Sequence, residues 1–297
     1  MITTRTLEAN GQSLFVRSVG RTNAPFVLFL HGFPEYGGAW DHILPHFADV
    51  AYAAAPDQRG YGLSSKPAGV EAYKAQLLAQ DMLALASVLA PGRPIHLVGH
   101  DWGASVAYMM AFLAPARIAK LVIINGVHPV PFQRALIDDA DQRAASQYIR
   151  FLRRPDAAEK LLADGCAKTL GLLTSGFGAG RWLTDDLKAR YLEAWQQPGA
   201  MDAMTNWYKA TPLLVPEVGE TVTADPLSRL DPAMLHVRMP HLVIWGLEDK
   251  ALRPACRVDL NAFAPDLTTV DVPGADHWIV HQNPDLVVTE IRRFFGL

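Results

Sequence analysis

The most informative part of the chain is the run Pro94-Ile95-His96-Leu97-Val98-Gly99-His100-Asp101-Trp102-Gly103-Ala104-Ser105. Its apolar first half predicts a buried strand, which ends in Gly-x-Asp-x-Gly and is followed at once by a helical pattern of small and apolar residues. The glycines permit a sharp turn, on which the central side chain projects over the sheet edge beside the first N–H groups of the helix. The run therefore predicts a nucleophile elbow with Asp101 at its tip.

A carboxylate at this position narrows the chemistry. A serine alkoxide suits acyl transfer, whereas a carboxylate attacks saturated carbon and gives an alkyl ester that must then be hydrolysed. Asp101 thus favours epoxides and alkyl halides over esters as substrates.

The composition sets mild limits on the function. The chain has 297 residues, half of them hydrophobic, and a net charge of −3, which gives no electrostatic basis for binding nucleic acid or an anionic membrane. Met1 to Gly11 has no apolar core, and no apolar run approaches the ~20 residues that span a bilayer. We therefore expect a soluble cytoplasmic protein that acts on small neutral molecules. Cys166 and Cys256 form no C-x-x-C pair and are interpreted as packed thiols.

Strand and helix patterns alternate in the outer parts of the chain. We expect a hairpin around Asn10-Gly11 and short apolar strands further along. The predicted strands are Thr4–Glu8, Ser13–Ser18, Phe26–Leu30, Val50–Ala55, Ile95–Val98, Leu121–Ile124, Leu242–Trp245 and Thr268–Val272. Helical patterns cover about 72–89, 103–114, 254–264 and 284–295. This alternation predicts an α/β fold with a mostly parallel, doubly wound sheet of eight strands.

The middle of the chain breaks the alternation. It carries only helical periodicity, over 144–152, 157–162, 186–195 and 200–208. We therefore predict a core made of residues 1–127 and 233–297, and an inserted all-helical cap, or lid, made of residues 128–232.

Three motifs in this order resemble the α/β-hydrolase superfamily and, within it, the epoxide hydrolases. They are His31-Gly32-Phe33-Pro34, Asp57-Gln58-Arg59-Gly60-Tyr61-Gly62-Leu63-Ser64 and the Gly99-His100-Asp101-Trp102-Gly103 elbow. Together with the inserted cap, the resemblance covers nearly the whole chain, and the ordered set is far more specific than any single motif.

The triad of such enzymes follows the order nucleophile, acid, histidine. The expected base is His277, on the loop after the last strand, and the expected acid is Asp249, with Glu248 as the alternative. Some related dehalogenases take the acid from the loop that here carries Asn125, which cannot bear the required charge. A zinc site on His277 and His281 is disfavoured because no third ligand is evident.

The resemblance also implies roles for residues around the elbow. The N–H groups of Phe33 and Trp102 would form the oxyanion hole, and the Phe33-Pro34 peptide bond would be cis. The rings of Phe33, Trp102 and Trp207 would contact the substrate. Asp57 and Arg59 are interpreted as a structural ion pair that braces the loop, and His100 as a residue that packs or hydrogen-bonds inside the elbow.

The cap distinguishes between epoxides and halides. An opening epoxide needs a proton donor, and epoxide hydrolases supply two cap tyrosines, which here match Tyr148 and Tyr208. In a haloalkane dehalogenase the indole of Trp102 would bind the leaving halide instead of forming the floor of an apolar pocket. A second halide donor would then be needed, for which the cap offers the indoles of Trp182, Trp195 and Trp207. Fluoroacetate dehalogenases share His-Gly-Phe-Pro but carry Arg where this chain has Trp102.

The sequence therefore predicts an epoxide hydrolase that converts an epoxide to a vicinal diol. Asp101 forms a hydroxyalkyl ester, Tyr148 and Tyr208 bind the epoxide oxygen, and water activated by His277 with Asp249 hydrolyses the ester. No metal or cofactor is expected, and the partners are a small-molecule epoxide and water, with no nucleic acid and no membrane. The chain is expected to be a monomer or a homodimer. The alternatives are a haloalkane dehalogenase with the same triad and a ligand-binding receptor on the hydrolase fold.

Overall fold

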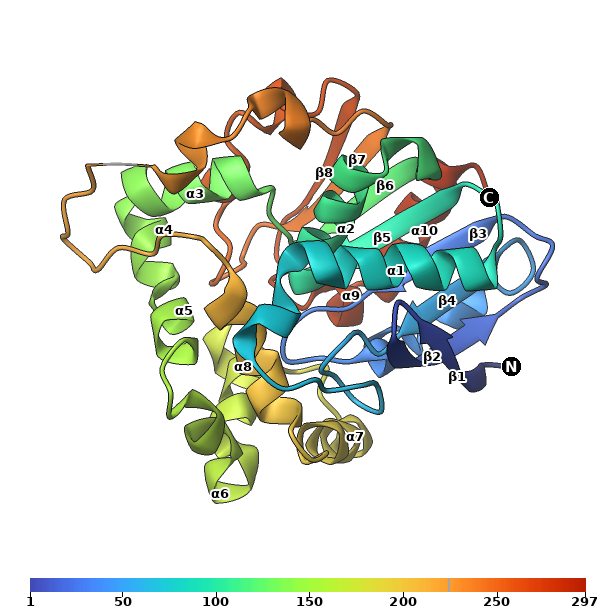
Figure 1. Ribbon diagram of the computed structural model, residues 1–297, viewed down its shortest axis with the longest axis horizontal. Coiled ribbons are helices and arrows are strands. Elements are labelled where there is room, and N and C mark those ends of the chain that lie inside the picture. Colours follow the sequence, from blue (N-terminus) through green and yellow to red (C-terminus); the bar gives the residue numbers. More distant parts are fainter. Residues whose placement is uncertain (224) are drawn as a thin grey trace.

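The computed structural model describes residues 1–223 and 225–297 and contains one sheet of eight strands (Figure 1). The strands are β1 (Thr3–Ala9), β2 (Gln12–Val19), β3 (Phe26–Leu30), β4 (Tyr52–Pro56), β5 (Ile95–His100), β6 (Ile118–Ile124), β7 (His241–Gly246) and β8 (Leu267–Val272). Their order across the sheet is β1-β2-β4-β3-β5-β6-β7-β8. β2 pairs antiparallel with both β1 and β4, and every other pair is parallel. The predicted mostly parallel α/β sheet is confirmed.

Helices cover both faces of this sheet. The flanking helices are α1 (Ala75–Leu89), α2 (Trp102–Leu113), α9 (Ile279–Gln282) and α10 (Pro284–Phe295). Side chains alternate along each strand, so Leu28 and Leu30 of β3 pack with the core that includes α1 and α2. Val27 and Phe29 pack on the opposite face, with the core that includes α10. The parallel strands are therefore buried on both sides, as their continuous apolar sequences require.

The chain between β6 and β7 forms helices that gather at one side of the sheet, on the left and at the bottom in Figure 1. They are α3 (Pro129–Asp138), α4 (Ala140–Ala145), α5 (Gln147–Leu152), α6 (Ala157–Gly171), α7 (Asp185–Trp195) and α8 (Ala200–Ala210). Residues 128–232 are called the cap below, and the division into core and cap stays a proposal. No strand lies in the described part of the cap.

Two predictions about local structure were wrong. Residues 254–264 form two short 3-10 turns, Pro254–Arg257 and Leu260–Ala262, instead of a helix. The chain leaves helical geometry between them, because Val258 has a ψ of 134° and Asp259 has a φ of 60°. Aspartate tolerates this left-handed backbone because its side chain is short and polar.

Asp57 and Arg59 do not pair with each other. Asp57 instead accepts from Arg17 at 2.6 Å, and Arg59 donates to Asp81 at 2.7 Å. Asp57, Arg59 and Asp81 are buried and Arg17 is partly buried, so each residue braces its loop against a different part of the core. Sequence adjacency misled the prediction, because each side chain finds its partner in a segment that the fold brings close from elsewhere in the chain.

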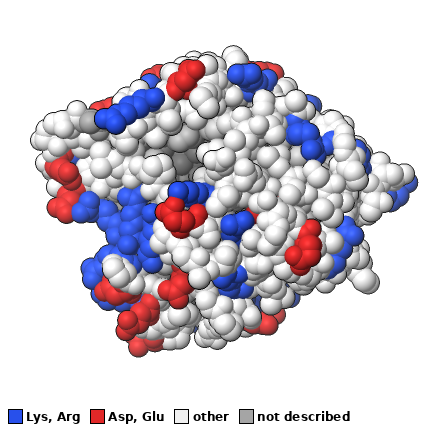
Figure 2. Space-filling model, viewed as in Figure 1, with Lys and Arg blue, Asp and Glu red and all other residues white. Residues whose placement is uncertain are grey.

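The surface shows mixed charge on the face drawn in Figure 2. Lysine, arginine and acidic side chains are interspersed there, in keeping with the small net charge. A hollow opens on this face between the parts of the chain that carry α3, α5 and the start of α2. Among the residues that the structure describes, no helix has both the length and the apolar character needed to cross a membrane.

Candidate active site

Asp101 lies at the turn between β5 and α2. Its backbone has φ 51° and ψ −119°, a conformation that residues with a side chain rarely adopt. The turn is tight because the backbone of Gly103 reaches the strand β3: a Cβ at Gly103 would lie 2.2 Å from the carbonyl oxygen of Leu30. The elbow therefore places the Asp101 carboxylate at the carboxyl edge of the sheet.

The loop after β3 supplies a hydrogen bond to this carboxylate. The N–H of Phe33 donates to Asp101 Oδ1 at 2.7 Å, and the Phe33-Pro34 bond is cis as predicted. Gly32 makes the approach possible, because a Cβ there would lie 2.2 Å from the same Oδ1. Trp102 is the first residue of α2, so its amide is one of the N–H groups that have no acceptor within the helix. Both expected oxyanion donors thus lie at the elbow.

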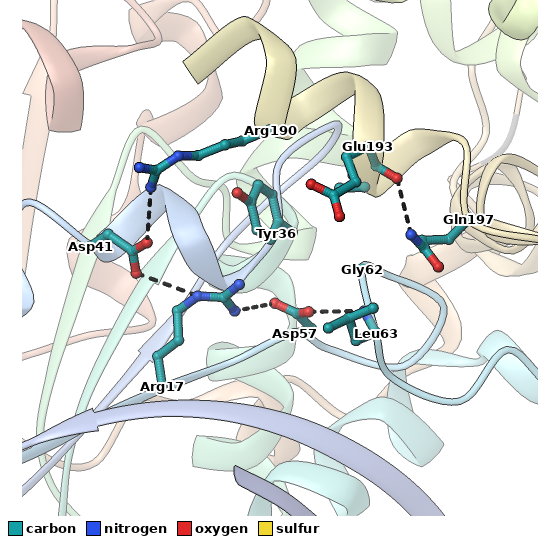
Figure 3. Close-up of a pocket in the computed structure, with 10 residues that line it drawn as sticks. Arg17, Tyr36, Asp41, Asp57, Gly62, Leu63, Arg190, Glu193 and Gln197 are labelled. Carbon is teal, nitrogen blue, oxygen red and sulfur yellow. Dashed lines mark hydrogen bonds and ion pairs between the residues drawn. The ribbon is translucent and has the colours of Figure 1, made fainter. Parts of the chain in front are cut away.

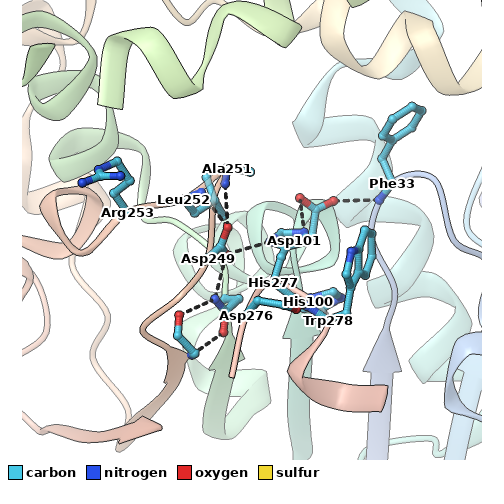
Figure 4. Close-up of polar contacts among 12 residues, drawn as sticks. Phe33, His100, Asp101, Asp249, Ala251, Leu252, Arg253, Asp276, His277 and Trp278 are labelled. Atoms are coloured by element: carbon cyan, nitrogen blue, oxygen red, sulfur yellow. Dashed lines mark hydrogen bonds and ion pairs between the residues drawn. The ribbon is translucent and has the colours of Figure 1, made fainter. Parts of the chain in front are cut away.

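The structure brings His277 and Asp249 together with Asp101 (Figure 4). His277 follows β8, and its Nδ1 lies 2.7 Å from Asp249 Oδ2. Its Nε2 lies 3.5 Å from Asp101 Oδ2 and has no hydrogen-bond partner among the described residues. One imidazole nitrogen is therefore anchored to the carboxylate of Asp249, while the other faces the carboxylate of Asp101.

Asp249 is fixed from two sides. Its Oδ1 accepts from the N–H groups of Ala251 and Leu252, each at 2.8 Å, and its Oδ2 accepts from Asn125 Nδ2 at 2.7 Å. Glu248 is exposed and lines a groove on the outer surface instead. The loop geometry therefore favours Asp249 over Glu248 as the partner of His277.

The pKa of His277 is raised from 6.5 to about 10. Burial alone would lower the pKa, but the charge of Asp249, its hydrogen bond to the ring, and the nearby carboxylate of Asp101 outweigh it. At neutral pH the imidazole is thus held as a cation between two carboxylates. Part of that stabilisation comes from Asp101 and disappears when the charge of Asp101 is removed.

Tyr148 of α5 and Tyr208 of α8 share a cavity with Asp101. Their ring centroids lie 6.1 Å apart, and both rings are nearly perpendicular to neighbours in the cap or elbow. Burial is the largest cause that raises the pKa of each phenol well above 10, and the charge of Asp101 adds to it. Both hydroxyls therefore remain protonated at neutral pH and are able to donate.

The cavity is narrow and mainly apolar. Its volume is about 40 Å³, and it is lined by Asp101, Trp102, Ser105, Val127, Phe132, Tyr148, Ile149, Tyr208, Thr211, Leu213 and Leu252. Asp101 is the one lining residue with a charged side chain. Pockets for larger ligands occupy several hundred Å³, so a substrate of that size requires the cap to move.

Of the three aromatic residues predicted to contact the substrate, only some lie at the cavity. Trp102 lines the cavity, and Phe33 packs edge-on against Tyr208 at 5.1 Å. Trp207 does not line it: the indole packs behind Trp102 and donates its N–H to the carbonyl of Arg59 at 3.0 Å. Its spacing along α8 fits a buried packing residue, which sequence alone does not distinguish from a contact residue.

The other two cap tryptophans also lie away from Asp101. Trp195 donates its indole N–H to the carbonyl of Pro34 at 2.5 Å, and Trp182 stacks on His281 at 4.0 Å beside the outer groove. Each of these indoles therefore has a location outside the cavity that contains the nucleophile.

His277 and His281 face different carboxylates. His281 Nε2 lies 2.6 Å from Glu35 Oε1, whereas His277 contacts Asp249 and Asp101. In the parts of the chain that the structure describes, no three His, Cys, Asp or Glu side chains gather as metal ligands would.

A family model described as alpha/beta hydrolase fold matches residues 25–284. This range includes the elbow, the loop with Phe33, and both His277 and Asp249. The chain belongs to the alpha/beta hydrolase family.

Relatives of this alpha/beta hydrolase include proteins named epoxide hydrolases. It is 33% identical to the AB hydrolase superfamily protein YfhM of Bacillus subtilis (strain 168), over 95% of this chain and 93% of that protein. It is 30% identical to epoxide hydrolase 4 of Mus musculus, over 91% of this chain and 72% of that protein. A solved structure described under novel epoxide hydrolases in metagenomes from hot environments matches with a TM-score of 0.90 and 34% identity, covering 99% of both chains. The chain is thus an epoxide hydrolase-like hydrolase.

The structure adds residues that sequence reasoning missed in this hydrolase. Asn125 was treated only as a position that lacks an acid, yet it donates to Asp249. Glu35 is buried and contacts His281, Tyr191 and His100, with His100 Nδ1 at 3.3 Å. A glutamate directly after His-Gly-Phe-Pro was the available signal, but nothing in the sequence shows that it is buried.

Proposed function

We propose that this hydrolase opens a neutral epoxide to a vicinal diol through a covalent ester on Asp101. The observation that carries the proposal is the shared cavity of Asp101, Tyr148 and Tyr208. It combines a carboxylate nucleophile with two protonated phenols, which is the donor set that an opening epoxide needs and that a departing halide does not.

In the first half-reaction, Asp101 attacks an epoxide carbon. The carbon forms a bond to a carboxylate oxygen while the ring C–O bond breaks, and the developing alkoxide is hydrogen-bonded by Tyr148 and Tyr208. Enclosure of these three groups under the cap supplies proximity and excludes bulk water.

In the second half-reaction, water attacks the ester carbonyl of Asp101. Esterification removes the charge of Asp101, so one of the two carboxylates that raise the pKa of His277 disappears. The pKa of His277 then falls, and the neutral imidazole becomes able to take a proton from water. The N–H of Phe33 already contacts the carboxyl oxygen on which negative charge then develops.

The cavity lining supports a neutral, largely apolar substrate. Phe132, Ile149, Leu213 and Leu252 offer no partner for a carboxylate or phosphate on the substrate. Since Asp101 is itself anionic, a negatively charged epoxide would also be repelled. We further propose a cytoplasmic monomer or homodimer that uses no metal or cofactor.

The positions of the tryptophans favour this proposal over a haloalkane dehalogenase. Trp195 and Trp207 donate their indole N–H groups to backbone carbonyls of the core, and Trp182 stacks on His281. A dehalogenase would instead need one of them directed at the leaving halide.

The test measures diol formation from styrene oxide, phenyl glycidyl ether and cis-epoxysuccinate, and bromide release from 1-bromobutane. We expect turnover of the two neutral epoxides and little of the dianion. Tyr148→Phe and Tyr208→Phe should each slow ester formation about 10²–10³-fold, because each removes one donor to the developing alkoxide. Tyr108→Phe, whose hydroxyl contacts His241 away from the cavity, is the matched control. Bromide release faster than diol formation, or an active double tyrosine variant, would contradict the proposal.

A further inference from the structure

The loop that carries Phe33 is tied to the cap by two buried side chains of α7. Trp195 donates its indole N–H to the carbonyl of Pro34 at 2.5 Å. Tyr191 donates its hydroxyl to Glu35 Oε1 at 2.6 Å. Both aromatic side chains are almost completely buried, so neither hydrogen bond competes with bulk water.

The same loop is held from the core side. Gln58 donates its side-chain amide to the carbonyl of His31 at 2.6 Å, and its backbone N–H donates to His31 Nε2 at 3.1 Å. The N–H of Glu35 donates to the carbonyl of Gly32 at 3.0 Å, which closes a turn around Phe33. The loop that carries Phe33 is therefore held by hydrogen bonds from the core on one side and from the cap on the other.

A polar pocket at the seam between α7 and the core adds to this attachment (Figure 3). Arg190 of α7 lies 3.7 Å from Asp41, which also contacts Arg17 at 3.3 Å. The ring of Tyr36 packs edge-on against Tyr191 at 5.6 Å. The pocket has a volume of about 240 Å³ and contains none of the catalytic residues, and the Arg190–Asp41 pair links α7 to the core across it.

We propose that Trp195 and Tyr191 are positioning residues, which keep the N–H of Phe33 directed at the carboxyl group of Asp101. This inference rests on the proposed function, because it concerns the step in which the Asp101 ester is hydrolysed. Hydrolysis of the ester therefore depends on the packing of α7 against the core. The oxyanion hole is then complete only when the cap is closed.

The two half-reactions use different parts of the cap. Ester formation depends on Tyr148 and Tyr208, which lie on α5 and α8. Ester hydrolysis depends on Phe33, whose loop α7 contacts. Loss of the Trp195 contact should therefore slow hydrolysis, whereas a general loosening of the cap should slow ester formation. An oxyanion donor acts only within a narrow range of distance, so a small displacement of Phe33 has a large effect.

The experiment compares Trp195→Phe with Trp182→Phe in rapid-quench single turnovers on styrene oxide. Trp195→Phe removes the indole N–H but keeps an aromatic ring, and Trp182 is a cap tryptophan whose indole N–H has no partner among the described residues. The ester on Asp101 is quantified by intact mass. For Trp195→Phe we expect ester hydrolysis slowed about 10–100-fold, accumulation of the ester, and ester formation within about twofold of wild type. Trp182→Phe should leave both rates within about twofold.

Tyr191→Phe serves as a second variant, which removes only the hydroxyl that contacts Glu35. It should slow the same step, and thermal unfolding of each variant shows whether the fold is retained. Slower ester formation with unchanged hydrolysis would overturn the inference, as would equal effects of Trp195→Phe and Trp182→Phe. Wild-type protein that turns over no epoxide would refute the proposed function itself, and this result is visible before any variant is made.

Discussion

Asn125 donates its side-chain amide to Oδ2 of Asp249 at 2.7 Å, the same oxygen that lies 2.7 Å from His277 Nδ1. The amide oxygen of Asn125 accepts from the N–H of Gly246 at 2.8 Å, so the orientation of the amide is fixed. An acid carried by the loop after β7 is thus held by a residue that follows β6. Related enzymes take this acid from one or the other of these two loops. Here the loop after β7 supplies the charged Asp249, and the loop after β6 supplies Asn125, which donates a hydrogen bond to it.

Asn125→Asp should slow ester hydrolysis about 10-fold or more. A second carboxyl against Asp249 replaces a donor with a like charge, which raises the pKa of one of the two acids and weakens the hold on His277. Single-turnover kinetics measures the effect. Asn125→Ala is the control, because Asp249 keeps the N–H groups of Ala251 and Leu252; a larger loss in the alanine variant than in the aspartate variant would contradict this account.

Asp249→Asn should keep the fold and reduce ester hydrolysis by several orders of magnitude. An amide cannot stabilise the imidazolium of His277 and favours the wrong tautomer, by analogy with other triads. Glu248→Gln should have little effect, because Glu248 is exposed on the outer surface. Steady-state kinetics with a saturating epoxide compares the two. Reversed results would move the acid to Glu248.

His277→Gln should form the ester and then stop. The imidazole acts only when water is activated, so Asp101 remains able to attack the epoxide. Intact-mass analysis should show one adduct, and peptide mapping should place it on Asp101. An unmodified variant, under conditions where wild type turns over, would indicate direct attack by water. In heavy-oxygen water, the first diol released by wild type should carry unlabelled oxygen from Asp101.

The pH dependence should reveal two states of His277. In the free enzyme its pKa is about 10, because two carboxylates outweigh burial, so the ring is protonated at neutral pH. In the ester, Asp101 is neutral and the pKa of His277 must be lower. Ester hydrolysis therefore requires the neutral ring and should rise with pH through this lower pKa, reaching its plateau before pH 10. NMR titration of the free enzyme and of Asp101→Asn, which imitates the neutral ester, provides the comparison; equal pKa values in the two proteins would refute the argument.

The elbow and the positions of the strands along the chain were predictable because they depend on local signals. Gly99, Asp101 and Gly103 specify a turn by backbone geometry alone, and apolar runs specify buried parallel strands. Helix α3 was not predicted from the sequence; Pro129 occupies its first turn, where a missing N–H has no cost.

The partners of buried polar groups were not predictable. Asp57 and Arg59 are two residues apart but pair with Arg17 and Asp81, which are distant in sequence. Asn125 and Trp195 likewise act on loops that the fold brings to them from elsewhere. Hydrogen bonds of this kind depend on tertiary position, whereas sequence periodicity reports only which side of an element faces the core.

The backbone of Asp101 has φ 51° and ψ −119°. At this position, the residue that would stabilise the fold most is not the residue that the proposed chemistry needs. Glycine adopts such dihedral angles without the steric cost that a side chain brings, which is about 1–3 kcal/mol. Asp101→Gly should therefore raise the melting temperature by a few degrees while it abolishes turnover, and calorimetry measures that rise. A selection scheme that rewards thermal stability alone would tend to replace the nucleophile. Engineering of higher thermal stability in this protein therefore has to keep Asp101 unchanged and introduce stabilising substitutions at other positions.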